Sequence, residues 1–291
     1  KIIWRKMSES QRKVKFDGKH WIGKKTRSGP LRVHNYNYVA EKASQNLGNG
    51  AIITIPNARP NEYRFEEFCS LTDKTKTIED RRAFYDSNYD IYFMKAQEIN
   101  TQINKVPITF LVYNLPYNKN LDDRDGIQVL HESHERNCII GITGTSCINN
   151  LEKALFVFPE LLNYTDFFVG YSSSAALFGH NKPSMDFYQR HMENQEFEHP
   201  LRKNDNHKIG VISISGGHRT PKTIWDYFKN GFRQTIGRSY TEISEPNSKK
   251  FMDDLRISLR NSRKEHLSMK PIIVETIRHA VSIKIIDKFR Q

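Results

Sequence analysis

Cysteine is scarce in this chain, and its pattern excludes several classes of protein. Only Cys69, Cys138 and Cys147 occur among 291 residues. Their odd number and irregular spacing give neither a disulfide framework nor the ligand spacing of a zinc site, which favours a reducing compartment. Apolar runs of about 18 residues are also missing, so no membrane insertion is expected. The hydrophobic share of 37% still allows a sizeable core, and the length suits one α/β barrel.

Positive charge is concentrated at the two ends of the chain. The net charge is +12, of which residues 1–32 carry +9 and residues 249–291 carry +6, so the middle carries −3. This asymmetry predicts an anionic partner such as RNA, and a solvated basic surface is the alternative. The candidate contacts are Arg12, Lys13, Lys15, Lys24, Lys25 and Arg27, with His218 and Arg219 after the last predicted strand. A basic, acid-poor start is also typical of a mitochondrial transit remnant, which predicts a mitochondrial protein, with a cytoplasmic location as the alternative.

Short β-branched or aromatic runs predict five strands that are covered on both faces, as in a parallel sheet. They are Ala51–Ile55, Ile108–Tyr113, Cys138–Thr143, Asp166–Tyr171 and Ile209–Ser215, with His20–Gly23 as a weaker sixth. Helical patterns lie between them, at 39–47, at 151–158 and after Thr220-Pro221. Alternating strands and helices predict an α/β fold.

Three regions follow from these patterns. Residues 1–32 form a basic extension or a degenerate start, and residues 33–230 form the body, with an insertion at 57–104. Within the insertion, the polar stretch Thr72–Asp90 is expected to be helical, and residues 192–207 are expected to form a loop. Residues 231–291 are expected to form a C-terminal helical region.

Several segments occur in an order that resembles a known family. They are VPITFLVYNLP (106–116), CIIGITGTS (138–146), DFFVGYSSSAAL (166–177), IGVISISGG (209–217) and PKTIWDYFKNG (221–231). In this order they resemble the dihydrodipicolinate synthase and N-acetylneuraminate lyase family. The resemblance implies a (β/α)₈ barrel with extra C-terminal helices, here incomplete at its N-terminus, because KIIWR stands where the family's carboxylate-binding turn belongs. The first strand and most of the second would then be missing.

The resemblance also assigns site residues. Tyr113 matches the family's proton-relay tyrosine, Gly170 a site glycine, and Ile212 an isoleucine that lines the keto-acid pocket. Thr143 occupies the position of the lysine that forms a Schiff base with the keto acid. A threonine hydroxyl cannot form an imine, so these residues are expected to be vestigial. We therefore expect a pseudoenzyme without a cofactor.

A structural or interaction subunit of a larger assembly, such as a mitochondrial ribosome, is the function that these patterns favour. Two alternatives stay open, namely an active lyase that uses a relocated lysine such as Lys119, and a regulatory subunit paired with an active paralogue. Homo-oligomers are also compatible with the resemblance. Weaker motif matches suggest a methyltransferase (NLPY, 114–117), a nucleotidyl ligase (KFDG, 15–18) or a metal site at His131 and His134.

Overall fold

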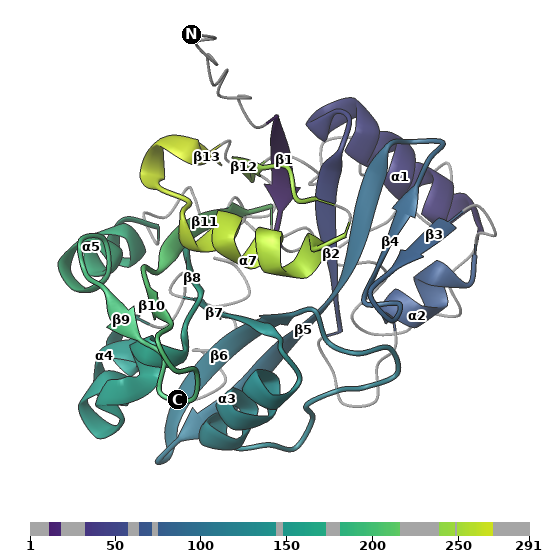
Figure 1. The fold of residues 1–291 in the computed structure, drawn as a ribbon. Coiled ribbons are helices and arrows are strands. Elements are labelled where there is room, and N and C mark those ends of the chain that lie inside the picture. The colour runs from purple at the N-terminus through teal and green to yellow at the C-terminus, as the bar shows by residue number, and fades with distance from the viewer. Residues whose placement is uncertain are drawn as a thin grey trace, which may run out of the picture.

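A mixed sheet curled into a barrel forms the body of the molecule (Figure 1). The structure is a computed structural model, and it describes residues 12–18, 33–57, 64–71, 75–143, 148–172, 181–215, 239–247 and 249–269. The neighbouring strands follow the order β11 (Gly210–Ile214), β8 (Phe167–Ser172), β7 (Ile139–Thr143), β6 (Val106–Tyr113), β5 (Ile91–Ile103), β2 (Ala51–Asn57), β1 (Lys13–Asp17), β12 (Ser239–Ser244) and β13 (Leu267–Met269).

Side chains bring the two ends of this sheet together. The Ser213 N–H of β11 donates to Thr241 Oγ1 at 2.9 Å, and Ser213 Oγ donates to the Tyr240 carbonyl at 2.6 Å, both on β12. These bonds cross the gap that no strand ladder spans in the described sheet, so the barrel is nearly closed.

The five strands predicted from β-branched or aromatic runs are confirmed as β2, β6, β7, β8 and β11. They are buried on both faces, which explains their continuous apolar runs. The expectation of a purely parallel barrel is wrong, however. β1, β2 and β5 pair in parallel, as do β7, β8 and β11, but β6 runs antiparallel to both β5 and β7, and β12 runs antiparallel to β1 and β13.

Helices cover the outer face of the sheet. They are α1 (Val33–Leu47), α2 (Arg64–Cys69), α3 (Gly126–Glu135), α4 (Ile148–Val157) and α5 (Asn181–His191). The predicted helices at 39–47 and 151–158 are confirmed by α1 and α4. Asp125 begins α3 with a capping box, in which its carboxylate accepts from Ile127 N and Gln128 N. None of the helices in the described parts of the chain is long and apolar enough to cross a bilayer.

One further helix, α7 (Phe251–Arg260), closes the end of the barrel where β7, β8 and β11 begin. Figure 1 shows it lying across that opening. Its residues Phe251, Met252, Leu255 and Leu259 join the inner cluster formed by residues such as Phe16, Tyr113, Phe167 and Ile212. The expected C-terminal helical region is therefore helical at α7, but a 3₁₀ turn (Lys264–His266) and strand β13 follow.

Two sequence expectations need correction. Thr72–Asp90 is not helical but forms a hairpin of β3 (Thr75–Ile78) and β4 (Ala83–Asp86), and the expected insertion also contains β5, a central strand of the barrel. Within the region expected to be a basic extension or degenerate start, β1 lies between β2 and β12 in the described sheet. The expected strand at His20–Gly23 and the helix at Thr220-Pro221 lie outside the described residues.

Candidate functional site

Polar residues stand where parallel strands of the barrel end. Strands β1, β2, β7 and β8 end at Asp17, Asn57, Thr143 and Ser172, and Ser215 follows β11. All five residues are buried. In α/β barrels the carboxyl ends of the strands carry the active site, so this polar rim is the candidate functional site.

Asp17 and Ser215 lie together across the seam of the barrel. The Ser215 N–H donates to Asp17 Oδ1 at 3.2 Å, and Ser215 Oγ donates to Asp17 Oδ2 at 2.7 Å. Both residues have no exposed surface. Charge-assisted hydrogen bonds of this kind are strong, so the pair ties β1 to β11.

Other rim residues also bond within the protein. Asn57 Nδ2 donates to Asn120 Oδ1 at 3.2 Å, and Thr143 Oγ1 lies 3.5 Å from the Thr109 carbonyl. The Ser172 N–H donates to Asn181 Oδ1 at 2.9 Å. Each of the five rim residues thus makes a hydrogen bond within the protein.

Tyr113 is buried in the barrel and serves there as a packing and hydrogen-bonding residue. Its ring stacks on Phe167 at 4.7 Å and meets Phe16 edge-on at 5.7 Å. Its hydroxyl donates to the Gly18 carbonyl at 2.6 Å. Burial, and then the negative charge of Asp17, raise the pKa of Tyr113 well above its ordinary value. A general acid–base residue works best with a pKa near the operating pH, so this environment does not suit a proton relay at neutral pH.

The structure separates Tyr113 from Thr143. Because β6 is antiparallel to β7, Tyr113 pairs with Ile139 at the beginning of β7, whereas Thr143 ends that strand. Four residues of extended chain span about 13 Å. A parallel barrel would have placed both residues at the same rim, as the lyase resemblance requires.

Gly170 and Ile212 also separate. A Cβ atom on Gly170 would meet Met185 Sδ at 2.4 Å, so this position faces α5 outside the barrel. Ile212 points inward with Tyr113, since a Cβ on Gly18 would lie 2.9 Å from Ile212 Cδ1 and 2.7 Å from the Tyr113 hydroxyl oxygen.

A buried lysine that the sequence patterns did not reveal lies on the outer face. Lys95 of β5 has no exposed surface and forms an ion pair with Glu66 of α2. Its Nζ also donates to the carbonyls of Pro116 at 3.2 Å and Lys119 at 2.7 Å. Burial lowers the pKa of Lys95, and the hydrogen bond and charge of Glu66 oppose that effect. The amine therefore anchors the loop after β6.

The described basic candidates all contact the protein itself. Arg12 lies 3.7 Å from Glu245, Lys13 Nζ donates to Ser244 Oγ at 3.4 Å, and the Lys15 amine lies 4.7 Å above the Tyr240 ring. Lys24, Lys25, Arg27, His218 and Arg219 lie outside the described residues.

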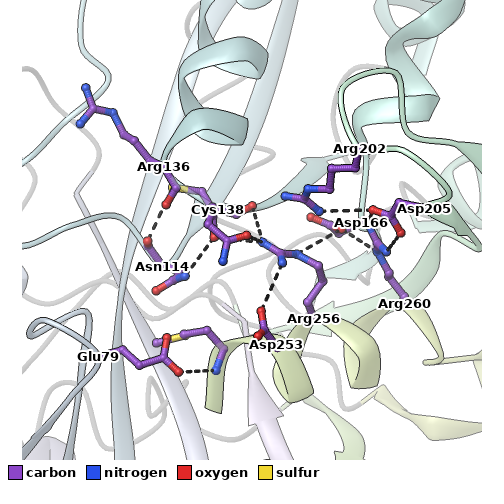
Figure 2. Close-up of polar contacts among 12 residues, drawn as sticks. Glu79, Asn114, Arg136, Cys138, Asp166, Arg202, Asp205, Asp253, Arg256 and Arg260 are labelled. Carbon is purple, nitrogen blue, oxygen red and sulfur yellow. Dashed lines mark hydrogen bonds and ion pairs between the residues drawn. The ribbon is translucent and has the colours of Figure 1, made fainter. Parts of the chain in front are cut away.

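The opposite end of the barrel holds an arginine–aspartate network (Figure 2). Arg260 of α7 donates from Nε to Asp166 at 2.7 Å and from both terminal nitrogens to Asp205, at 2.7 and 3.0 Å. Arg256 donates to the Asn137 and Cys138 carbonyls at 2.9 and 3.0 Å. Burial alone would raise the pKa of Asp166, but the charges of Arg260 and Arg256 hold it below its ordinary value. The network fixes α7 against the starts of β7 and β8.

Within the described parts of the chain, no three His, Cys, Asp or Glu side chains gather closely enough to hold a metal ion. His131 and His134 lie on α3 but contact different partners. His131 Nε2 lies 3.4 Å from the Tyr164 hydroxyl, and the His134 ring packs on His199 at 4.9 Å.

Comparison with known proteins shows a likeness of fold and no family match. No protein family model and no curated protein matches the chain. Its fold is similar to the crystal structure of a two-domain protein from Bacteroides vulgatus that contains a predicted PHP-like metal-dependent phosphoesterase. The TM-score is 0.51 at 13% identity, and the match covers 88% of this chain and 64% of that chain. At this identity the likeness concerns the fold alone.

This likeness corrects the lyase resemblance. The matching fold is that of a phosphoesterase-containing protein, not of a dihydrodipicolinate synthase or N-acetylneuraminate lyase. The antiparallel β6 gives the physical reason, because it places the supposed relay tyrosine and the supposed lysine position at opposite ends of β7. The short apolar runs predicted the strands, but they carry no information about strand direction.

Proposed function

We propose that this protein is a binding scaffold for a phosphate-bearing polyanion, with RNA as the first candidate. One observation supports the scaffold role most directly: the described polar residues at the strand ends make hydrogen bonds within the protein, as Asp17 does with Ser215 and Asn57 with Asn120. Groups arranged in this way stabilise the barrel.

Two independent features support a phosphate-bearing partner. The ends of the chain carry +9 and +6 around a middle of −3, which favours polyanions. The similar fold belongs to a protein that contains a predicted phosphoesterase, an enzyme class that acts on phosphate esters. An assembly such as a mitochondrial ribosome is the setting that we propose, and native co-purification followed by mass spectrometry would identify it.

Fluorescence anisotropy with labelled single-stranded RNA tests the binding. The logarithm of the affinity should fall linearly with the logarithm of salt concentration, with a slope of about −0.7 per neutralised phosphate. Replacing Lys24, Lys25 and Arg27 with Gln should make this slope shallower by about 0.7 for each phosphate that is no longer neutralised.

The matched control is Lys153→Gln on α4, which removes one charge from a helix of the near-neutral middle. It should leave the slope unchanged. Binding that does not depend on salt, or a triple variant that behaves like wild type, would overturn the proposed contacts.

Metal-dependent phosphoester hydrolysis is the second candidate, and the fold likeness favours it. The described residues alone do not fit a metal centre, since Asp17 is the one carboxylate among the five rim residues and both of its oxygens accept from Ser215. The assay is hydrolysis of p-nitrophenyl phosphate and its diester with Mn²⁺, Mg²⁺ or Zn²⁺. Turnover that EDTA abolishes and Asp17→Asn lowers would support the enzyme over the scaffold. Turnover equal to a blank would exclude hydrolysis of these esters and leave the binding proposal to the RNA titration.

A further inference from the structure

Three histidines meet around a short hairpin near the strand starts. The hairpin, called the histidine hairpin below, spans residues 197–207 and contains β9 (Phe197–Glu198) and β10 (Asn206–His207). The His199 ring packs on His134 of α3 at 4.9 Å and lies 6.2 Å from His207. It also meets Tyr164 edge-on at 5.5 Å. His199 therefore joins the hairpin to α3 and to the 3₁₀ helix Pro159–Tyr164.

The hydrogen bond of His199 requires a neutral ring. Its Nδ1 accepts from the Leu201 N–H at 3.2 Å. A proton on Nδ1 would turn this acceptor into a donor facing another donor. His199 is 4% exposed, so water cannot readily compensate. His207 differs, because its Nε2 and Nδ1 lie 3.0 and 3.3 Å from the carbonyls of Thr165 and Asp205, which can both accept.

Charged groups from every neighbouring element face this site. Arg202 and Asp205 belong to the hairpin itself, His134 comes from α3, and Asp166 precedes β8. Arg256 and Arg260 come from α7, and His131 and Tyr164 complete the aromatic contacts.

Burial, then Arg202 and His134, lower the pKa of His199 to about 4, against the smaller opposite effects of Asp166 and Asp205. Burial, then Arg202 and Arg256, likewise lower the pKa of His134, against the opposite effect of Glu135. The His134 Nδ1 is buried and has no hydrogen-bond partner among the described residues.

We propose that the His134–His199 pair is an acid-sensitive latch, which holds the histidine hairpin on α3 while both rings are neutral and releases it when the pair takes up a proton. Release of the histidine hairpin would also weaken the contacts that hold α7. The hairpin carries Asp205, which accepts two hydrogen bonds from Arg260. An acidic environment would therefore loosen the helix that closes the barrel, without disturbing the strands first.

Hydrogen–deuterium exchange tests the latch on the full chain. Exchange is measured at pH 7 and pH 5, with labelling times scaled for the pH dependence of the chemical exchange rate. Peptides that cover 193–208 should lose at least about tenfold in protection at pH 5, while peptides from β7 and β8 should keep theirs. Equal protection of the hairpin at both pH values would overturn the proposal.

His199→Asn separates the latch from general acid sensitivity. Its Oδ1 can take the place of Nδ1 as acceptor for Leu201, and it does not titrate. Hairpin protection in this variant should fall by clearly less between pH 7 and pH 5 than in wild type, because His134 is the one member of the pair that still titrates. The matched control is His266→Asn, because His266 Nδ1 also accepts a backbone N–H, that of Arg263 at 3.0 Å, but lies in the 3₁₀ helix after α7. This control should lose hairpin protection at pH 5 as wild type does, and an equal loss in His199→Asn would refute the role of His199.

Discussion

Gly210 lies so close to α7 that a larger side chain at this position would interfere with the packing of the helix. A Cβ atom on Gly210 would lie 1.7 Å from the Leu259 carbonyl oxygen and 2.7 Å from Ser262 Oγ. The first neighbour is backbone, so α7 would have to move as a unit. Gly210→Ala is therefore expected to lower the free energy of unfolding by about 3 kcal/mol, the upper end for overpacking, in urea titrations.

Gly48 is the matched comparison, because it is constrained by its backbone and not by space. Its φ is +83° and nothing lies within 4 Å of an added Cβ. Gly48→Ala should cost only about 1 kcal/mol, from the left-handed conformation. If the two alanine variants lost equal stability, the close approach of β11 to α7 would not be a determinant of the fold.

Lys95 tests a different kind of constraint, a buried charge with a dedicated partner. Lys95→Met leaves Glu66 buried without its cation, and breaking such a pair is expected to cost about 3 kcal/mol. The double variant Lys95→Met, Glu66→Gln should recover part of that loss, since the uncompensated charge is gone. Chemical denaturation of both variants measures the difference, and a double variant less stable than Lys95→Met would show that the amine's carbonyl contacts dominate instead.

At the scale of elements, α7 can be tested by comparing its two faces. Leu255 is fully buried in the barrel, whereas Ile257 is 55% exposed. Leu255→Ala should lower the free energy of unfolding by about 2 to 5 kcal/mol, and Ile257→Ala by less than about 0.5 kcal/mol. Thermal and urea unfolding give both values. Similar losses at the two positions would mean that α7 does not plug the barrel as described.

The elements also show what the sequence could and could not predict. Apolar runs buried on both faces revealed β2, β6, β7, β8 and β11, because their composition reflects burial directly. The sequence patterns did not reveal β5, because Lys95, Gln97 and Glu98 interrupt its apolar pattern. Lys95 and Gln97 find partners in the loop after β6, which no local pattern shows. Asn104-Lys105 forms a two-residue hairpin turn, with positive φ values of 47° and 68°. Asn is a favoured residue in such turns, so this dipeptide was a signal for a hairpin. Recognising it would have shown that β6 runs antiparallel to β5, and would have separated Tyr113 from Thr143.

For the whole molecule, the candidate site depends on contacts that no local pattern contains. Asp17 and Ser215 are 198 positions apart, and Tyr113 reaches the Gly18 carbonyl across 95 positions. The residue types were visible in the sequence, but their meeting requires the barrel to close. The concentration of positive charge at the two ends, in contrast, could be predicted from the sequence, because a count of charged residues does not depend on the fold.

Acid should destabilise the folded chain as a whole, and the sign follows from the buried histidines. The pKa of His199 is about 4 in the folded protein and about 6.5 in the unfolded chain, so the unfolded chain binds more protons between these values. This contribution to stability is complete above pH 6.5 and is lost as the pH falls toward 4, by at most about 3 kcal/mol. Asp166 has a folded pKa lowered by Arg260, so its contribution is also lost on acidification, but below about pH 4. Urea unfolding at pH 7.5, 6.0 and 5.0 should therefore give falling free energies for wild type and a shallower fall for His199→Asn. An identical fall in both would assign the acid sensitivity to other groups and remove His199 from the account.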